Sequence, residues 1–323
     1  MACFLSPLLY LYGYNTEKRL ICPVRFSQVL EFEILRKSEK QTTGGVFVQL
    51  LKYILIAGFL VGLFIGIQFL MVVWNQEDQL FFETTISEQH QDEAAENAAI
   101  EEIRLTTADQ EELHGWLRHP VDAADEPMPL LLYFGGNAEE KTQAALSHDW
   151  IEGYRIAFIN YRGYGLSSGS PGENELFADS ELIFDRLVER DDVSEDQVVS
   201  FGRSMGSAPA THLATARDLA GTILAAPYDS RVRVQEHRHP WLPIGPFIRH
   251  PFEVSTMAEE IGSPLLILTG TDDQVIPPEH SAVTADSWQG EVTANQYEGF
   301  GHNDMQMHPD YQGDIQAFLD ELQ

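Results

Sequence analysis

Residues 198–208 read Val-Val-Ser-Phe-Gly-Arg-Ser-Met-Gly-Ser-Ala, and the architecture of the chain follows from how this stretch folds. The valines and Phe201 predict a buried strand, and Ala208–Arg217 favours a helix. Between them, Gly202–Gly206 forms a G-x-S-x-G pattern, which predicts a tight strand-to-helix turn with Ser204 at its apex. The N-terminal amides of the following helix then point at charge that develops on a substrate. Because the pattern also arises by chance, the flanking strand and helix carry the interpretation.

Strand and helix patterns alternate on both sides of this turn. Short apolar runs are typical of strands that are buried on both faces of a sheet. Strands that alternate with helices predict an α/β fold with a doubly wound, mainly parallel sheet. The expected strands are Pro129–Phe134, Arg155–Tyr161, Thr222–Leu224, Pro264–Thr269 and Val292–Tyr297, after a hairpin-like pair at Ile103–Thr107 and Leu113–Leu117, with further helices near Ala144–Ile151 and Phe177–Glu189.

Residues 228–260 interrupt this rhythm with a segment rich in proline and aromatic residues. We expect it to form a short lid insertion over the C-terminal edge of the sheet. Its apolar side chains either line an acyl pocket or pack the insertion onto the body, and the sequence favours neither reading. They are Trp241, Leu242, Ile244, Phe247, Ile248 and Phe252.

Three loops that follow predicted strands hold candidates for nucleophilic catalysis. A reactive serine needs a base, a group that orients the base, and donors for an oxyanion. In an open α/β sheet these groups lie in loops after the C-terminal ends of strands. One such loop contains Asp272 and Asp273, another contains His302, and the turn 135–138 offers backbone amides. The order Ser, Asp, His along the chain is that of the α/β-hydrolase arrangement.

Five motifs in this order resemble those of the α/β-hydrolase superfamily. Within it, residues 100–323 are similar to the serine aminopeptidase-like branch of α/β-hydrolase domains, many of whose members carry one N-terminal membrane anchor. The motifs are F-G-G-N-A-E (134–139), N-Y-R-G-Y-G-L-S-S-G-S-P (160–171), G-R-S-M-G-S (202–207), G-T-D-D-Q-V-I-P (270–277) and G-F-G-H-N-D (299–304).

This resemblance implies a role for each candidate residue. Ser204 is the nucleophile, His302 is the general base, and Asp273 is the acid, with Asp272 as the fallback. The backbone amides of Met205 and Asn137 form the oxyanion hole. The family usually has His-Gly before Asn-Ala, whereas this chain has Gly-Gly at 135–136. Backbone donors survive that change, so it puts the local rigidity of the turn in doubt rather than the donors.

An apolar stretch precedes the hydrolase-like part. Tyr53–Trp74 holds 22 residues without a formal charge, enough to cross a hydrocarbon core of about 30 Å. The alternative is a buried helix of a soluble domain, but such helices rarely stay apolar all round. We therefore expect one transmembrane helix at residues 53–74. Gly58, Gly62 and Gly66 recur every fourth residue and suggest a homodimer contact.

The flanking charges predict the topology of this span. Arg36, Lys37, Lys40 and Lys52 precede it, and no Lys or Arg follows until Arg104. The positive-inside rule places residues 1–52 as a cytoplasmic tail and the remainder on the non-cytoplasmic side, which is the periplasm in a Gram-negative cell. A start site near Val46 is the alternative for the first residues. Residues 75–99 read as an acidic, solvated tether before the domain at 100–323.

Charge excludes one class of function and suggests an environment. The formal net charge is −30: residues 1–74 carry seven basic against four acidic side chains (+3), and the rest carries thirteen against forty-six (−33). Such a domain does not suit a phosphate backbone, so no nucleic-acid role is expected. An acid-rich surface suits a salty environment. No metal or cofactor is expected, because the histidines at 237, 239, 250 and 308 lack cysteine or carboxylate partners at ligand spacing.

The sequence therefore predicts a membrane-anchored serine hydrolase. We expect it to cleave an ester or thioester of a small-molecule or lipid-like acyl substrate through an acyl-enzyme. The first alternative is a peptidase or amidase of the serine aminopeptidase type. The second is a non-catalytic binding protein on the same fold.

Overall fold

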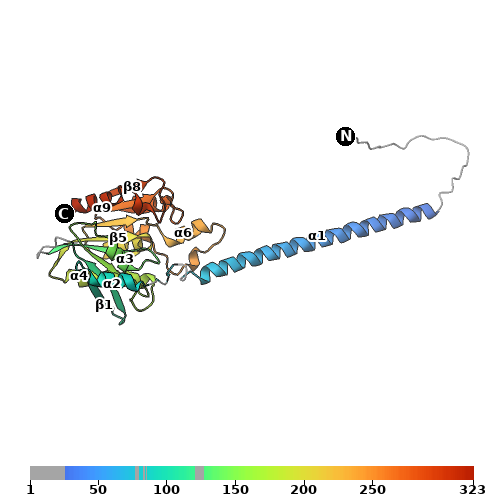
Figure 1. Ribbon diagram of the computed structural model, residues 1–323. Coiled ribbons are helices and arrows are strands. Elements are labelled where there is room, and N and C mark those ends of the chain that lie inside the picture. The colour runs from blue at the N-terminus through green and yellow to red at the C-terminus, as the bar shows by residue number, and fades with distance from the viewer. Residues whose placement is uncertain (1–25, 77–79, 83, 85, 121–126) are drawn as a thin grey trace, which may run out of the picture. The chain divides into compact units, whose positions relative to one another are not determined.

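Eight strands form one sheet in the order β1-β2-β4-β3-β5-β6-β7-β8 (Figure 1). Only β2 runs antiparallel to its neighbours, and the other adjacent pairs are parallel. The prediction of a doubly wound, mainly parallel sheet is thereby confirmed. The strands are β1 (Ile100–Thr106), β2 (Glu112–Arg118), β3 (Met128–Phe134), β4 (Arg155–Ile159), β5 (Val193–Arg203), β6 (Gly221–Ala225), β7 (Leu265–Gly270) and β8 (Val292–Tyr297).

Two hydrophobic cores lie on opposite faces of this sheet. Successive residues of β3 alternate between them: Leu130 and Leu132 belong to one core, and Leu131 and Tyr133 to the other. This alternation follows from the two-residue period of a strand, and it explains why the strands read as uninterrupted apolar runs.

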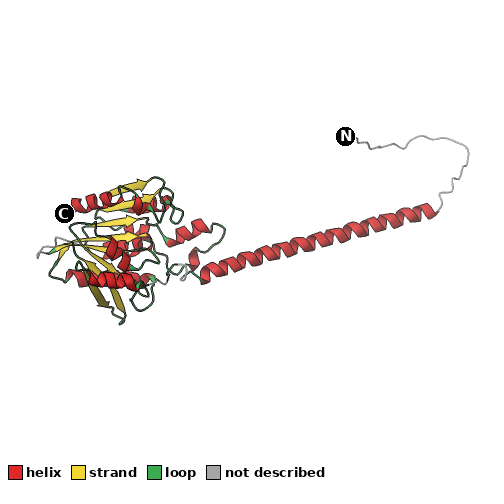
Figure 2. Ribbon diagram, in the orientation of Figure 1, coloured by secondary structure: helices red, strands yellow, loops and turns green. Residues whose placement is uncertain are grey.

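Helices cover the sheet (Figure 2). They are α2 (Glu88–Glu96), α3 (Lys141–Ser147), α4 (Glu173–Val188), α5 (Ser207–Ala216), α6 (Arg231–Arg238), α7 (Val254–Ala258), α8 (Pro278–Ser287) and α9 (Tyr311–Glu321), with 3-10 turns η1 (Ser204–Gly206), η2 (Gly245–Phe247) and η3 (Met305–Met307).

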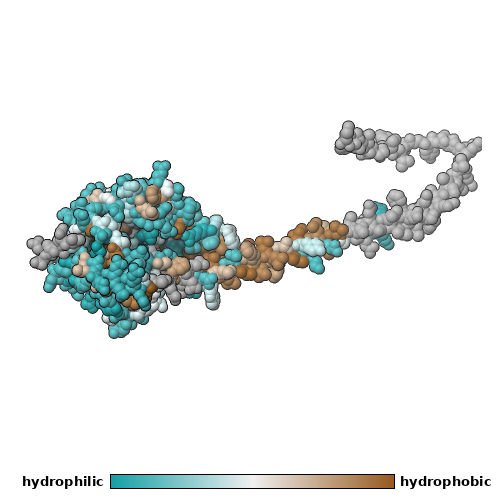
Figure 3. Space-filling view, viewed as in Figure 1, coloured by the Kyte–Doolittle hydropathy of each residue, from teal (hydrophilic) through white to brown (hydrophobic). Residues whose placement is uncertain are grey.

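The computed structural model describes residues 26–76, 80–82, 84, 86–120 and 127–323. The chain divides into two units at Ile67, and the sheet belongs to the second. The described part of the first unit is helical, within α1 (Phe26–Trp74). This helix begins well before the predicted span, and its apolar portion is Gly45–Trp74, with a mean hydropathy of 2.5 over its most apolar window. Figure 3 shows the apolar surface along this portion.

Residues 75–99 contain ordered contacts that their polar composition does not suggest. Gln76 is 2% exposed; its side chain donates to the carbonyl of Phe247 and accepts from the amide of Arg249. Helix α2 begins after Ser87, whose hydroxyl caps it by accepting from the amide of His90. The predicted solvated character therefore does not hold at Gln76. The limits of tail, span, tether and domain remain predictions.

The insertion at 228–260 folds as α6, η2 and α7. Leu242, Ile244 and Phe252 are at most 4% exposed, whereas Trp241 and Phe247 are about half exposed, at 52% and 50%. The first three side chains thus pack the insertion onto the body, which is one of the two readings that the sequence left open.

Candidate active site

The G-x-S-x-G stretch forms the predicted strand-to-helix turn. Strand β5 ends at Arg203, η1 spans Ser204–Gly206, and α5 follows without a break. Ser204 has a φ of +52°, a left-handed conformation that is strained for a residue with a side chain and typical of the serine at a strand-to-helix nucleophile turn. A Cβ on Gly206 would lie 1.9 Å from the carbonyl oxygen of Phe134. Glycine at this position therefore lets the turn press against the end of β3.

Three side chains from separate loops form a chain of hydrogen bonds. The Oγ atom of Ser204 lies 2.9 Å from Nε2 of His302, and Nδ1 of His302 lies 2.7 Å from Oδ2 of Asp273. All three residues are at most 9% exposed. Because Asp273 binds Nδ1, Nε2 is free to accept a proton from the serine hydroxyl. This arrangement allows His302 to activate Ser204.

The structure distinguishes between the two neighbouring aspartates. The second oxygen of the Asp273 carboxylate, Oδ1, accepts from the amides of Val275 and Ile276 at 2.8 Å each. These bonds fix its orientation while Oδ2 faces the imidazole. Asp272 is exposed and bonds only weakly to the hydroxyl of Thr271, at 3.4 Å. Asp273 is therefore the group that reaches His302.

A cavity of about 220 Å³ opens onto Ser204 and His302. Asn137 and Met205, the two expected oxyanion residues, both line it. The amide of Met205 belongs to the first turn of a helix, where amides lack intrahelical partners and can bind an anion. The structure thus brings the predicted nucleophile, base and oxyanion residues to one place.

The walls of the cavity differ from those that the sequence suggested. None of the six apolar lid residues singled out from the sequence is among the lining residues. The lid contributes Val234, Gln235 and Arg238 of α6 instead, and Leu80 comes from the predicted tether. The available signal for Leu80 was the apolar triplet Leu80-Phe81-Phe82 inside this polar segment. The acyl-pocket reading of the six lid residues is therefore corrected.

Two further polar contacts, one at the site and one outside the cavity lining, were not predicted. Arg203, inside the G-x-S-x-G motif, donates from Nη2 to the carbonyl oxygen of His302 at 3.1 Å. Asp229, after β6, lies 2.8 Å from Nδ1 of His280 in a second buried aspartate–histidine pair. The place of Asp229 after a buried strand was the available signal for this pair.

Within the described part of the chain, no group of three His, Cys, Asp or Glu side chains is arranged to hold a metal ion.

Known proteins share the sequence pattern of this unit. The family described as "Serine aminopeptidase, S33" matches residues 140–243, a range that includes Ser204 but not Asp273 or His302. An uncharacterised protein of Mycobacterium tuberculosis H37Rv is 26% identical over 244 residues, which cover 74% of this chain and 84% of that protein. Mouse alpha/beta hydrolase domain-containing protein 17C is 30% identical over 195 residues, 58% of this chain and 59% of its own length.

Solved structures share the fold. An esterase from Pyrococcus furiosus superposes with a TM-score of 0.59 at 14% identity, covering 75% of this chain and 97% of the esterase. An alpha-beta hydrolase from Vibrio vulnificus superposes with a TM-score of 0.60 at 21% identity, covering 76% and 90%. At these identities the similarity establishes the architecture and leaves the substrate open.

Proposed function

Because the chain belongs to the α/β-hydrolase superfamily, we propose that it is a serine hydrolase that cleaves an ester or thioester through an acyl-enzyme. The observation that carries this proposal is the continuous hydrogen-bond chain from Ser204 through His302 to Asp273. A protein that used this fold only for binding would not require a strained serine whose hydroxyl lies 2.9 Å from an oriented imidazole.

The proposed reaction follows from this geometry. Ser204 Oγ attacks the acyl carbon while Nε2 of His302 takes the hydroxyl proton. The amides of Met205 and Asn137 stabilise the oxyanion, and Asp273 stabilises the imidazolium. The leaving alcohol or thiol receives that proton from His302, and an ester between Ser204 and the acyl group remains. Water then attacks the acyl-enzyme by the same steps. His302 accepts a proton from the water, and the hydroxide oxygen bonds to the acyl carbon. His302 returns that proton to Ser204 as the carboxylic acid departs.

The lining of the cavity supports an apolar acyl group as the bound portion of the substrate. Leu80, Met205, Val234 and Ile276 supply apolar surface in the cavity, and Arg231 and Arg238 add two charged groups. Burial of each methylene in such a site contributes about 0.8 kcal/mol. We therefore expect hydrolysis to depend on acyl-chain length until the chain fills the cavity.

A panel of p-nitrophenyl esters of graded chain length, set against aminoacyl anilides, tests this proposal on the full chain. We expect turnover of the esters, and its loss in Ser204→Ala. Leu80→Trp should lower activity on the longer esters and spare acetate, because it narrows the cavity. Phe82→Trp is the matched control, since Phe82 is 45% exposed and does not line the cavity. Turnover that persists in a folded Ser204→Ala protein contradicts the mechanism.

A peptidase or amidase of the serine aminopeptidase type is the second candidate, and the family match over residues 140–243 favours it. A preference for the anilides in the same panel would select it. The same triad serves both reactions, so only the substrate assignment would change. The absence of turnover on both substrate classes would favour a binding protein.

We also propose that α1 anchors the enzyme in a membrane with residues 75–323 on the non-cytoplasmic side. The apolar portion of α1 has 30 residues, about 45 Å at 1.5 Å per residue, which exceeds the hydrocarbon core. A Cβ at Gly58, Gly62 or Gly66 meets no atom within 4 Å, so this stripe leaves room for the proposed homodimer. Protease added to spheroplasts should digest the catalytic domain; survival until detergent is added would reverse the orientation.

A further inference from the structure

Lys141 is the only lysine beyond residue 74, and its side chain is fully buried. Its ammonium nitrogen has no hydrogen-bond partner among the described residues. The nearest carboxylate oxygen, Oε1 of Glu139, lies 3.7 Å away. The rings of Tyr133 and Tyr161 face it with centroids at 5.3 and 5.2 Å. A buried cation without a close hydrogen bond is costly, so stability alone does not account for this lysine.

The ammonium occupies the space beside the first residue of the oxyanion turn. A Cβ on Gly135 would lie 1.9 Å from the Lys141 nitrogen. The carbonyl oxygen of Gly135 accepts a hydrogen bond of 2.8 Å from the hydroxyl of Tyr161. Lys141 and the Glu139 carboxylate, whose Cδ would lie 2.6 Å from the same Cβ, therefore fill the volume that a side chain at 135 would need.

Glu139 and Arg203 extend this contact to the Ser204 turn and the His302 loop. Glu139 Oε2 accepts from the amide of Gly136 at 2.9 Å and lies 3.7 Å from Nη1 of Arg203. Arg203 in turn donates to the carbonyl oxygen of His302. Burial raises the pKa of Glu139, but the charges of Lys141 and Arg203, together with hydrogen bonding that includes the Gly136 amide, hold that pKa below its usual value. A charged carboxylate thus ties the oxyanion turn to the Ser204 turn and the histidine loop.

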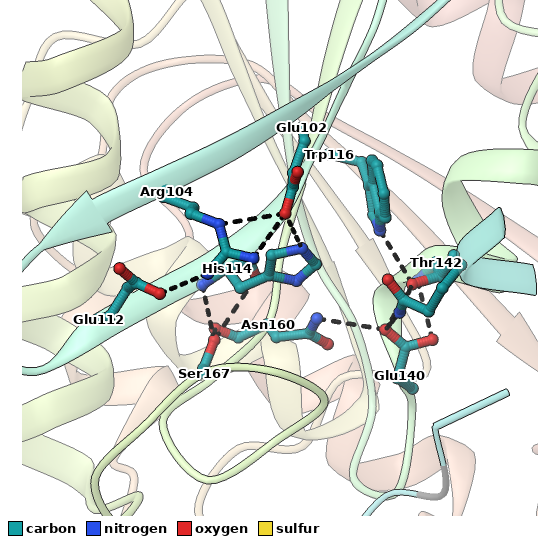
Figure 4. A network of polar contacts seen from close by, with 10 residues as sticks. Glu102, Arg104, Glu112, His114, Trp116, Glu140, Thr142, Asn160 and Ser167 are labelled. Carbon is teal, nitrogen blue, oxygen red and sulfur yellow. Dashed lines mark hydrogen bonds and ion pairs between the residues drawn. The ribbon is translucent and has the colours of Figure 1, made fainter. Parts of the chain in front are cut away.

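The helix that carries Lys141 is itself fixed at its first turn (Figure 4). Thr142 accepts a hydrogen bond of 2.9 Å from the indole of Trp116 on β2. Asn160, after β4, donates to Glu140 at 3.3 Å and accepts from the backbone amide of Lys141 at 3.0 Å. These bonds hold α3 against the sheet, so the base of the Lys141 side chain has a fixed position.

From this arrangement we propose that Lys141, Glu139 and Arg203 are positioning residues that set the distance between the oxyanion turn and Ser204. The proposal rests on the function proposed above and adds a specific device to it. Glycine at 135 and lysine at 141 form a pair, in which the lysine occupies the space that a side chain at 135 would need. None of the three residues contacts the reacting atoms, so they act through the turn.

The first test measures whether Lys141 acts on the transition state. Lys141→Met keeps the volume and removes the charge. We expect kcat to fall by about 10- to 100-fold with KM nearly unchanged, because an interaction made only in the transition state is weakened. A trifluoromethyl ketone, which forms a tetrahedral adduct on Ser204, should lose affinity by a similar factor. Thr211→Val is the matched control, since Thr211 is also fully buried with an unpartnered hydroxyl but lies on α5.

The second test uses the pairing of residues 135 and 141. Gly135→Ala should reduce kcat strongly on the wild-type background and less on a Lys141→Ala background. The shortened side chain removes the tightest contact, at 1.9 Å, and lets the Glu139 carboxylate, at 2.6 Å from the built Cβ, shift into the vacated space. Additive effects of the two substitutions would overturn the proposal. A Lys141→Met protein with wild-type kcat and wild-type inhibitor affinity would also overturn the proposal. The same holds if Lys141→Met lowers thermal stability but leaves kcat and inhibitor affinity unchanged. If Lys141→Met does not fold, Lys141→Gln provides the same measurements.

Labelling with a fluorophosphonate separates this proposal from the underlying function. Ser204 of Lys141→Met should still be labelled, at a reduced rate. Failure of the wild-type protein to label at Ser204 would contradict the proposed function instead.

Discussion

Asp272 and Asp273 are adjacent in the sequence, but only Asp273 faces His302. Its two oxygens are divided between the imidazole and the backbone of the loop. That division fixes the histidine tautomer in which Nδ1 carries the proton and Nε2 can accept one from Ser204. This tautomer predicts how far kcat falls when each of the two aspartates is replaced by asparagine.

Asp273→Asn should lower kcat by about 10³- to 10⁴-fold, because an amide that donates to Nδ1 selects the wrong tautomer of His302. Asp272→Asn is the matched control and should retain nearly full activity. Steady-state kinetics on an activated ester, with thermal melts of both variants, provides the measurement. Equal losses in the two variants would show that the loop, rather than one carboxylate, is required.

The strands and the nucleophile turn could be predicted because their signals are local. Apolar runs mark strands that are buried on both faces, and the predicted hairpin-like pair corresponds to the antiparallel β1 and β2. Helix α3 begins at Lys141, three residues before the predicted start, because the Glu140 carboxylate accepts from the amide of Thr142. Neither α8 nor α9 was predicted from the sequence. The cavity walls could not be predicted, because Leu80 and α6 meet Ser204 only through tertiary packing.

The space around two glycines, one in the nucleophile turn and one in α9, predicts opposite effects of their substitution by alanine. Gly206→Ala places a Cβ 1.9 Å from the Phe134 oxygen, and we expect a loss of about 1–3 kcal/mol in stability together with most of the activity. Gly313, in α9, has no atom within 4 Å of a built Cβ. Gly313→Ala should stabilise the protein by about 0.5–1 kcal/mol through its helix propensity. Urea unfolding of both variants measures these changes in the free energy of unfolding. A Gly206→Ala protein as stable as the wild type would contradict the packing described for the turn.

The contact between α4 and α5 predicts a dependence on pH. Arg217 lies 2.8 Å from Asp185 and 2.9 Å from Glu181. Its hydrogen bonds lower the pKa of Asp185, and those of His212 and Arg217 lower the pKa of Glu181. Both groups are depressed in the folded state, so their contribution is present above the ordinary values of 3.8 and 4.5 and is lost as the pH falls below them.

Arg217→Gln should therefore cost about 0.2–1 kcal/mol at pH 7, a small value because the pair is partly exposed. The difference between wild type and variant should shrink towards pH 3. Chemical denaturation at both pH values measures it. A difference that stays constant with pH would mean that Arg217 acts through packing alone.

Charge over the catalytic unit sets how the protein responds to its solvent. Residues 75–323 carry forty-six acidic side chains against thirteen basic ones, and Figure 3 shows polar residues over most of the visible face of this unit. Like charges at this density repel each other in the folded state, and salt screens that repulsion over a Debye length of about 10 Å at 0.1 M.

The melting temperature of the full chain in detergent should therefore rise as NaCl is raised from about 0.02 M to 1 M, a range over which screening changes most. Sucrose at matched osmolality is the control for excluded-volume effects. A melting temperature that is highest in the low-salt buffer would contradict the proposed adaptation to a salty environment.

The proposed mechanism requires one nucleophile, and fluorophosphonate labelling of the full chain followed by peptide mass spectrometry locates it. We expect a single adduct on Ser204, which disappears in a Ser204→Ala protein with an unchanged melting temperature. A folded wild-type protein that remains unlabelled, or equal labelling of the Ser204→Ala protein, would contradict this mechanism.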